Sequence, residues 1–407
     1  MKILPKKIFI FIIIIIFFMA FSSSYTALSI DNIETVVAIG LDVSDYNKLK
    51  ISFQFTNSSS VSESGTSEQS PSIIYSIDAS SVSSGINLMN AYIGKELSLS
   101  HCKLIAISEE LAYQGISEKI YTLINDAQVR PSANIVITKC NARLYMENSK
   151  PLFENLLTKY YEIFSNSSKY TGFSVNATIG DFFNSLVCKS CEPYAILGGL
   201  NSEPNNSDTS INAQKDYSGK ANNSNVEGEL GSENMGLAVF NDDKLAGELN
   251  SIETLCFLAT KNQIDGFLLS IPSTDQNKGY TDIYLTPTAN TSSKVEIING
   301  TPYITIKYRF SGRIYSIDSD SKYLSNDVLN DISDSCNTYL ESIFSDYLYQ
   351  TSKFLKSDIN GFGKDAKKLF LTDDEYNEYN WENNYKNAFF KVEVDSSIRS
   401  SLLLTET

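Results

Sequence analysis

Hydrophobic and polar residues follow two different periods along the N-terminal half of the chain. In residues 49–55, apolar side chains occupy every second position between lysine, serine and glutamine, which predicts a half-buried strand. The short β-branched runs 36–39 and 135–137 predict strands in the interior of a sheet. Residues 86–93 carry apolar side chains at helical spacing, and Ser117, which we expect to be an N-cap, precedes a second such stretch. This half therefore combines helices and strands.

The C-terminal half has a different order of elements. Residues 235–249 predict two strands around an Asn-Asp-Asp turn. Residues 294–310 predict a hairpin, because the Asn-Gly pair in its middle accepts the positive φ angles of a type I′ turn. Two more apolar runs, 313–317 and 389–394, predict a continuation of this set of strands and a final strand.

The strongest helical pattern in the chain begins at Asn326 or Asp327, which we expect to cap it, and extends to about Lys356. Its length would be roughly 45 Å at 1.5 Å per residue. We expect this helix to cover one face of the antiparallel sheet, and a partner surface is the alternative for its apolar side. The apolar positions, spaced by three, four or seven residues, are Leu329, Ile332, Cys336, Leu340, Ile343, Tyr347 and Phe354.

Two polar segments interrupt these patterns. Residues 57–72 are rich in Ser and Glu, and residues 201–232 are rich in Asn, Ser, Gly and Asp, so neither buries enough apolar surface to offset its chain entropy. We expect the first to be a surface loop. We expect the second to be a flexible linker between an N-terminal α+β domain at 25–200 and a C-terminal α+β domain at 233–400. The predicted fold class is α+β and multi-domain, with mixed or antiparallel sheets packed with helices.

Residues 1–24 predict export. Three lysines precede an unbroken apolar run at positions 8–21, and three serines follow it. This run fits a signal-peptide core of about 7–15 residues and is shorter than the roughly 20 residues that span a bilayer. An uncleaved N-terminal anchor is the alternative. No later segment is long and apolar enough to cross a membrane.

Charge narrows the range of partners. The 407 residues carry 33 basic and 48 acidic side chains, a formal charge of −15. This balance argues against a nucleic-acid partner, because no basic patch is evident that would neutralise phosphates, and against docking on anionic lipid through charge. The single histidine, His101, excludes metal cages and proton relays that need several imidazoles. We expect His101 to be structural, at the start of a strand.

The sequence contains no recognisable motif for catalysis, cofactor binding or metal binding. Cys188-Lys-Ser-Cys191 is open to three interpretations, a redox dithiol, half of a zinc site or a small local disulfide, and we expect the six cysteines to be scattered, mostly buried thiols. Residues 361–363 (Gly-Phe-Gly) predict a helix C-cap and turn rather than a phosphate loop. Acidic clusters at 242–243, 318–320 and 373–375 lack the spacing of a calcium-binding loop. We predict no catalytic, cofactor-binding or metal-ligating residue, and no enzymatic activity.

Five segments occur in an order that matches a known family. The first half contains residues 31–42 (DNIETVVAIGLD), residues 96–111 (ELSLSHCKLIAISEEL) and residues 126–131 (DAQVRP). The second half contains residues 236–247 (GLAVFNDDKLAG), followed by Glu253, and residues 358–364 (DINGFGK), followed by Trp381. Together they resemble the Ger(x)C family, the C subunits of spore germinant receptors, over nearly the whole mature chain.

The resemblance implies an exported lipoprotein with a multi-domain α+β body and without known chemistry, at the outer face of the spore inner membrane beside integral-membrane A and B receptor subunits. Its role would lie in nutrient-triggered germination. The family usually carries a lipid-bearing cysteine just after the signal, but residues 22–31 contain none. We therefore expect retention through an uncleaved N-terminal segment or through the partners. The main alternative is an exported module that captures a small germinant directly, and a third is a hydrolase with paired carboxylates.

Overall fold

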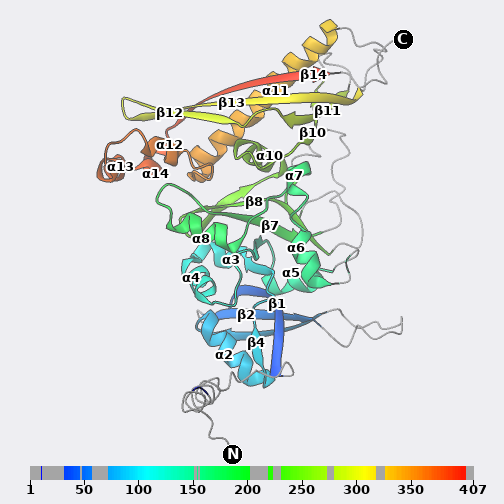
Figure 1. Ribbon diagram of the computed structural model, residues 1–407, viewed down its shortest axis with the longest axis vertical. Coiled ribbons are helices and arrows are strands. Elements are labelled where there is room, and N and C mark those ends of the chain that lie inside the picture. Colours follow the sequence, from blue (N-terminus) through cyan, green and yellow to red (C-terminus); the bar gives the residue numbers. More distant parts are fainter. Residues whose placement is uncertain are drawn as a thin grey trace, which may run out of the picture.

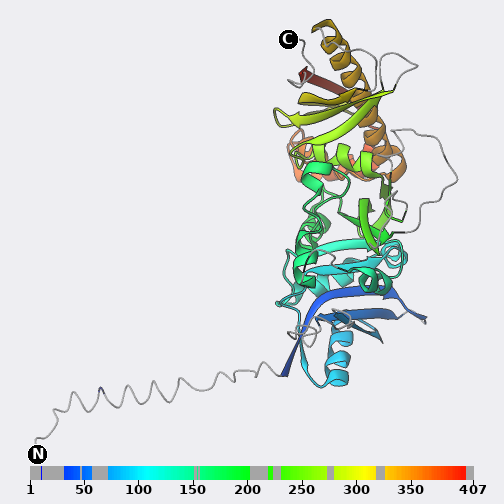
Figure 2. The same cartoon turned by 90° about the vertical axis from the view of Figure 1, so that its right-hand side faces the viewer.

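The computed structural model describes most of the chain. Figure 1 shows an elongated molecule, with the first strands of the N-terminal sheet at one end and the long helix α11 with the C-terminal sheet at the other. Figure 2 shows the same order from the side. Apart from residue 11, the predicted export segment lies outside the described residues, and no described helix has both the length and the apolar character to cross a bilayer. The described residues are 11, 32–45, 48–56, 72–150, 154, 156–201, 219–222, 231–272, 279–317 and 326–399.

Within the described residues, the N-terminal sheet has nine strands. Their order is β3-β2-β1-β5-β6-β7-β8-β9, with β4 beside β1. β1, β5, β6 and β7 run parallel at the centre, and antiparallel pairs extend the sheet on both sides. The strands are β1 (Ile33–Val43), β2 (Leu49–Thr56), β3 (Ser72–Ala79), β4 (Glu96–Ser98), β5 (Leu104–Ser108), β6 (Asn134–Thr138), β7 (Tyr194–Leu200), β8 (Ser232–Asn241) and β9 (Lys244–Leu249).

Helices connect the parallel strands, because a crossover between parallel neighbours needs a long connection. In the part of the chain that the structure describes, two helices link β5 to β6, and four link β6 to β7. The predicted interior strands are confirmed, since residues 36–39 of β1 and 135–137 of β6 are 0% exposed. The helices of this half are α2 (Val82–Ile93), α3 (Glu109–Gln114), α4 (Ser117–Asn125), α5 (Ala142–Asn148), α6 (Leu157–Ile163), α7 (Ser168–Thr171) and α8 (Ile179–Val187).

β2 forms where the sequence predicts a half-buried strand, at residues 49–55, but the strand is buried on both faces. Its polar residues Ser52 and Gln54 are 0% exposed, because α5 covers the side on which they lie. Gln54 accepts a hydrogen bond from Tyr161 Oη at 2.8 Å and donates one to the Met146 carbonyl at 3.3 Å. Ser52 Oγ lies 2.7 Å from Ser76 Oγ. The alternation along β2 therefore marks two packed faces, of which one is polar and internally hydrogen-bonded.

α4 begins at Ser117, but the prediction that Ser117 is its N-cap is wrong. The backbone N–H and the hydroxyl of Ser117 both donate to Asp243 Oδ2, at 3.2 and 2.6 Å. Asp243 lies in the turn between β8 and β9, so a distant carboxylate stabilises the positive end of the helix. Burial by itself raises the pKa of Asp243. The hydrogen bonds from Ser117 outweigh this effect, so the pKa lies below its usual value.

The segment 201–232 joins two neighbouring strands of one sheet. β7 ends at Leu200, β8 begins at Ser232, and the two strands pair antiparallel. The N-terminal sheet therefore continues past the predicted linker to Leu249, and the next sheet begins with the following strand. The domain limits at 25–200 and 233–400 stay a prediction, but the strands on either side of the segment belong to one sheet.

Among the residues described, the C-terminal sheet has five strands in the order β10-β11-β13-β12, with β14 beside β13. The predicted hairpin is confirmed, with φ angles of 51° at Asn299 and 79° at Gly300 in its turn. The run at 313–317 is the second half of β13 and not a separate strand. β14 lies parallel to β13, so the sheet is mixed. The strands are β10 (Phe267–Pro272), β11 (Tyr280–Pro287), β12 (Ser292–Ile298), β13 (Thr301–Ile317) and β14 (Phe389–Arg399).

The predicted long helix is confirmed as α11 (Asn326–Tyr349), which continues into the π-helical turn η4 (Gln350–Leu355). It packs on one face of the C-terminal sheet, where Phe344 stacks on Tyr308 with ring centroids 3.9 Å apart. Phe354, expected in the apolar stripe, is instead 73% exposed. The wider π-helical turn changes the period, so Leu355 is buried in its place.

α11 also covers the outer edge of β14. Three polar residues, four positions apart on the helix, accept hydrogen bonds from backbone N–H groups at every second residue of β14. Four helical residues rise about 6.0 Å and two strand residues about 6.6 Å, so the spacings match. An open strand edge pairs readily with other chains, and this cover prevents it. The donors are Ile398 N to Ser333 Oγ at 3.3 Å, Ser396 N to Asn337 Oδ1 at 2.9 Å and Val394 N to Glu341 Oε1 at 3.2 Å.

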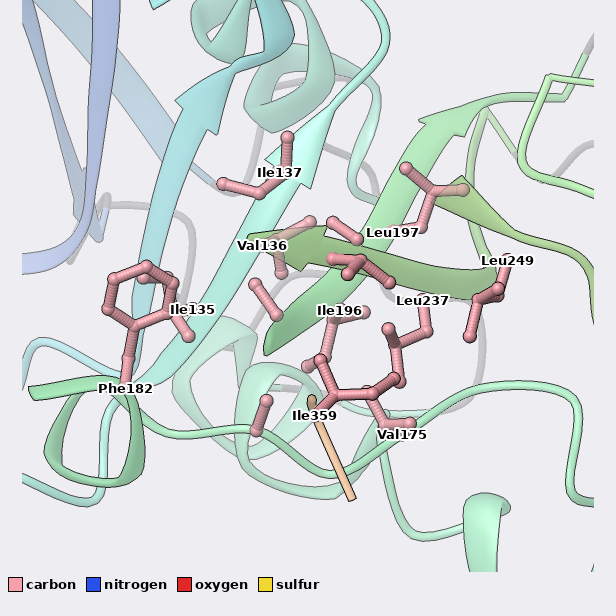
Figure 3. Packing of buried hydrophobic residues seen from close by; sticks show 14 of the residues in the cluster. Ile135, Val136, Ile137, Val175, Phe182, Ile196, Leu197, Leu237, Leu249 and Ile359 are labelled. Carbon is pink, nitrogen blue, oxygen red and sulfur yellow. The ribbon is translucent and has the colours of Figure 1, made fainter. Parts of the chain in front are cut away.

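The two sheets share one hydrophobic core, and the α+β class is confirmed. Figure 3 shows Ile359, from the segment after η4, beside Val175 and Ile196 of the N-terminal half. Ser357 Oγ donates to the Phe240 carbonyl, which ties the same segment to β8. The chain after the long helix therefore returns to the N-terminal sheet. The remaining helices are α10 (Ser251–Thr260), α12 (Gly363–Lys367), α13 (Asp373–Tyr379) and α14 (Trp381–Tyr385).

Candidate functional site

The described acidic clusters noted in the sequence form hydrogen bonds in turns and at helix ends. Asp243 caps α4, as described above. Glu375 in the first turn of α13 donates its N–H to the Thr372 hydroxyl at 3.2 Å and accepts the Leu371 N–H at 2.9 Å. The cluster at 318–320 lies outside the described residues. Within the described ranges, no three His, Cys, Asp or Glu side chains gather as a metal site, and His101 is exposed in the turn before β5.

Cys188 and Cys191 form a local disulfide, one of the three alternatives for this pair. The other four cysteines are free, and three of them are buried. The disulfide lies in the loop between α8 and β7 and lines a hollow of about 270 Å³. Asp242 and Lys189 line the hollow from the N-terminal half, and Trp381 and Glu382 of α14 line it from the C-terminal half. The hollow therefore lies where the two halves of the molecule meet.

A buried acid lies next to this hollow. Glu192 is 6% exposed, and its Oε2 accepts the Asp242 N–H at 2.7 Å. Burial raises the pKa of Glu192 to about 8, and the negative charges of Glu382, Asp242 and Asp358 raise it as well, against the hydrogen bond from Asp242. Glu192 is therefore mostly protonated at neutral pH. The junction between the two halves contains a neutral carboxylic acid that ionises at mildly alkaline pH.

The glycine-rich element at 358–364 and Trp381 meet at one carboxylate. Asp358 is 4% exposed, and burial raises its pKa to about 6 although its hydrogen bonds lower it. The element is a turn around Asp358, and the expected C-cap at this point is instead Lys356, with φ of 54°. A Cβ at Gly363 would lie 2.8 Å from the indole ring. The donors to Asp358 are Gly361 N at 3.0 Å, Phe362 N at 3.1 Å, Gly363 N at 2.7 Å and Trp381 Nε1 at 2.9 Å.

Exposed apolar side chains gather on α2 and β3. Leu88 and Tyr92 lie one turn apart on α2 and are 45% and 71% exposed, and Ile73 and Tyr75 on β3 are 43% and 40% exposed. The rings of Tyr75 and Tyr92 touch, with centroids 5.9 Å apart. We name these four residues the α2–β3 face. Scattered exposed apolar residues are common, whereas a contiguous group indicates an interaction surface.

Sequence reasoning identified α2 as a helix but missed its outer face. The available signal is the absence of any Asp, Glu, Lys or Arg from residues 82–93, in a chain with 20% charged residues. The polar stripe of α11 was also missed, although its spacing of four is visible in the sequence. Glu253, one of the resemblance residues, completes a capping box with Asn250 at the start of α10.

Comparison with known proteins gives the family. Residues 27–197 match the family model described as spore germination protein N-terminal domain, and residues 235–401 match that described as spore germination B3/GerAC like, C-terminal. No curated protein matches. A solved structure described as the crystal structure of the GerBC protein aligns with a TM-score of 0.49 and 16% identity, over 88% of this chain and 96% of that one. The predicted resemblance is confirmed by the two family models: the chain belongs to the Ger(x)C family of spore germination proteins.

Proposed function

We propose that this chain is the C subunit of a spore germinant receptor and acts through contacts with other proteins, without catalysing a reaction. The observation that carries the proposal is the match of both family models, in order, to the two halves of the chain. The geometry supports a binding role. Asp243 and Asp358 serve a helix cap and a turn, and the α2–β3 face offers a surface for an interaction.

The proposed location is the outer face of the spore inner membrane, beside the integral-membrane A and B subunits. The predicted export segment at 1–24 supports this placement, because it directs the chain across a membrane. Since residues 22–31 lack a cysteine, the chain is held there by its apolar N-terminal run or by its partners, and not by a lipid on a cysteine at that position.

Co-purification tests the proposal directly. The full chain, carrying a C-terminal affinity tag, is isolated from detergent-solubilised spore membranes, and the proteins bound to it are identified by mass spectrometry. We expect the A and B subunits in the eluate and a retained or trimmed N-terminus that carries no diacylglycerol. Recovery of the tagged chain alone, or only from the soluble fraction, would contradict a receptor subunit. A tagged protein from another complex of the same membrane is the control.

The hollow beside the disulfide supports a second candidate, direct capture of a small germinant. Its volume of about 270 Å³ and its mix of an indole, a lysine and two carboxylates suit a small polar solute. Calorimetry of the full chain in detergent against amino acids, sugars and nucleosides tests this role. Saturable heat that is lost in Glu382→Gln, with Glu378→Gln as the exposed control, would favour the sensor. Absence of heat with every solute would reject it.

A further inference from the structure

The α2–β3 face contains no Asp, Glu, Lys or Arg. The exposed positions of α2 are Ser83, Asn87, Leu88, Ala91 and Tyr92, and none of them is Asp, Glu, Lys or Arg. The chain as a whole carries a formal charge of −15. An acidic surface is repelled by anionic phospholipid headgroups, and a charged side chain resists transfer into the interface. This uncharged face meets neither obstacle.

The residue types on the face suit a lipid interface. Tyrosine combines an apolar ring with a hydroxyl, and it concentrates at the level of the headgroups, where both parts find their preferred surroundings. Tyr75 and Tyr92 form such a pair, and Leu88 lies one helical turn before Tyr92. Behind the face, Gly85 of α2 packs closely on Ile51 of β2, so the helix is held against the sheet.

The end of α2 lies beside the start of β1, the strand that follows the apolar N-terminal run in the sequence. β1 starts at Ile33 and pairs in parallel with β4, which follows α2 after only Gly94 and Lys95. Lys95 Nζ lies 2.8 Å from Glu34 Oε2, so the start of β1 and the end of α2 are joined. In Figure 1, α2 and β4 lie at the lower end of the molecule. The eleven residues 22–32 span at most roughly 40 Å, so an apolar run in the bilayer keeps this end within that distance of the headgroups.

We infer that the α2–β3 face lies in the headgroup layer of the membrane, with Tyr75, Leu88 and Tyr92 in contact with phospholipid. This inference rests on the proposed placement of the chain at the membrane. The face fixes the orientation of the body, so that the C-terminal sheet points away from the bilayer. A single apolar run tethers a protein without orienting it, whereas a second contact one helix away restricts its rotation.

Tryptophan fluorescence tests the inference, because the native chain contains one tryptophan, Trp381, which is 3% exposed and gives a constant background. The full-length variants Tyr92→Trp and Leu88→Trp are reconstituted in vesicles of phosphatidylethanolamine and phosphatidylglycerol with brominated acyl chains. Tyr315→Trp on β13 is the matched control, since Tyr315 is 61% exposed and β13 lies near the opposite end of the molecule in Figure 1. Circular dichroism confirms that each variant folds.

We expect the emission of Tyr92→Trp and Leu88→Trp to shift to the blue and to be quenched by the brominated chains, while Tyr315→Trp keeps its emission. Equal quenching of all three variants, or quenching of none, would overturn the inference. A third outcome would also overturn the inference: the brominated chains do not quench the emission in vesicles, and aqueous iodide does not quench it in the purified receptor. This outcome would assign the face to a protein partner. Co-purification is measured separately, so a chain that joins the receptor but is not quenched refutes only the lipid contact.

Discussion

Removal of the polar stripe of α11 is expected to open the edge of the C-terminal sheet. The perturbation is the triple change Ser333→Ala, Asn337→Ala and Glu341→Ala, which removes the acceptors for three N–H groups of β14. It also removes the bond that Ser333 Oγ donates to the Ser396 carbonyl at 3.1 Å. At about 0.5–1.5 kcal/mol net for each hydrogen bond, the four bonds sum to about 2–6 kcal/mol. Alanine has a higher helix propensity by about 0.5 kcal/mol at each of the three sites, which leaves a net loss of about 0.5–4.5 kcal/mol.

Urea denaturation gives the free energy of unfolding, and amide hydrogen exchange gives the local effect. We expect the amides of Val394, Ser396 and Ile398 to exchange faster in the triple variant, and sedimentation to show dimers or larger species formed through the open edge. The matched control is Asp331→Ala with Asp334→Ala, two exposed positions on the same helix, with a change of about 0.5 kcal/mol or less per site. Unchanged exchange at these three amides would refute the proposed role of the stripe.

Three further changes test the junction and the N-terminal sheet. Asp358→Ala leaves four N–H donors without their acceptor, so we expect a loss of about 2–4 kcal/mol in unfolding free energy and a red shift of the emission of Trp381. Glu192 is an acid whose folded pKa of about 8 lies above its unfolded value, so its contribution to stability is present at acid pH and is lost as pH rises from about 5 to 8. The unfolding free energy of Glu192→Gln, measured across that range, should therefore fall less than that of the native chain. Gly236→Ala should cost more than about 1 kcal/mol, measured by thermal unfolding, since the residue has φ of 94° and a Cβ would lie 2.5 Å from the Leu249 carbonyl oxygen.

Local patterns predicted the elements of this fold well. The β-branched runs in β1 and β6, the Asn299-Gly300 turn and the apolar stripe of α11 each depend on residues close together in the sequence. The features that the sequence did not reveal depend on distant contacts. Asp243 caps α4 across 126 residues, and α5 covers the polar side of β2. The pairing of β7 with β8 across 201–232 could not be predicted from composition either. A polar segment that joins two domains has the same composition as one that joins two neighbouring strands.

The candidate site was also predictable from the sequence only in part. The resemblance segments indicated that Asp358, the following glycines and Trp381 matter together, but only the fold shows that the carboxylate binds all of them. The α2–β3 face depends on which side of α2 packs inward, and that is set by the sheet beneath it. Helical spacing alone gives the apolar positions of α2, but it does not say that Leu88 and Tyr92 stay outside.

Germination kinetics of spores that lack this gene test the central claim, that the chain is a receptor subunit required for the response to nutrients. The rate of germination is measured with the nutrient that triggers the parent strain and, as a control, with a trigger that bypasses nutrient receptors. We predict that the mutant spores respond normally to the control trigger, lose most of their nutrient response and recover it when the gene is restored. A nutrient response at the parental rate in the mutant would contradict the account.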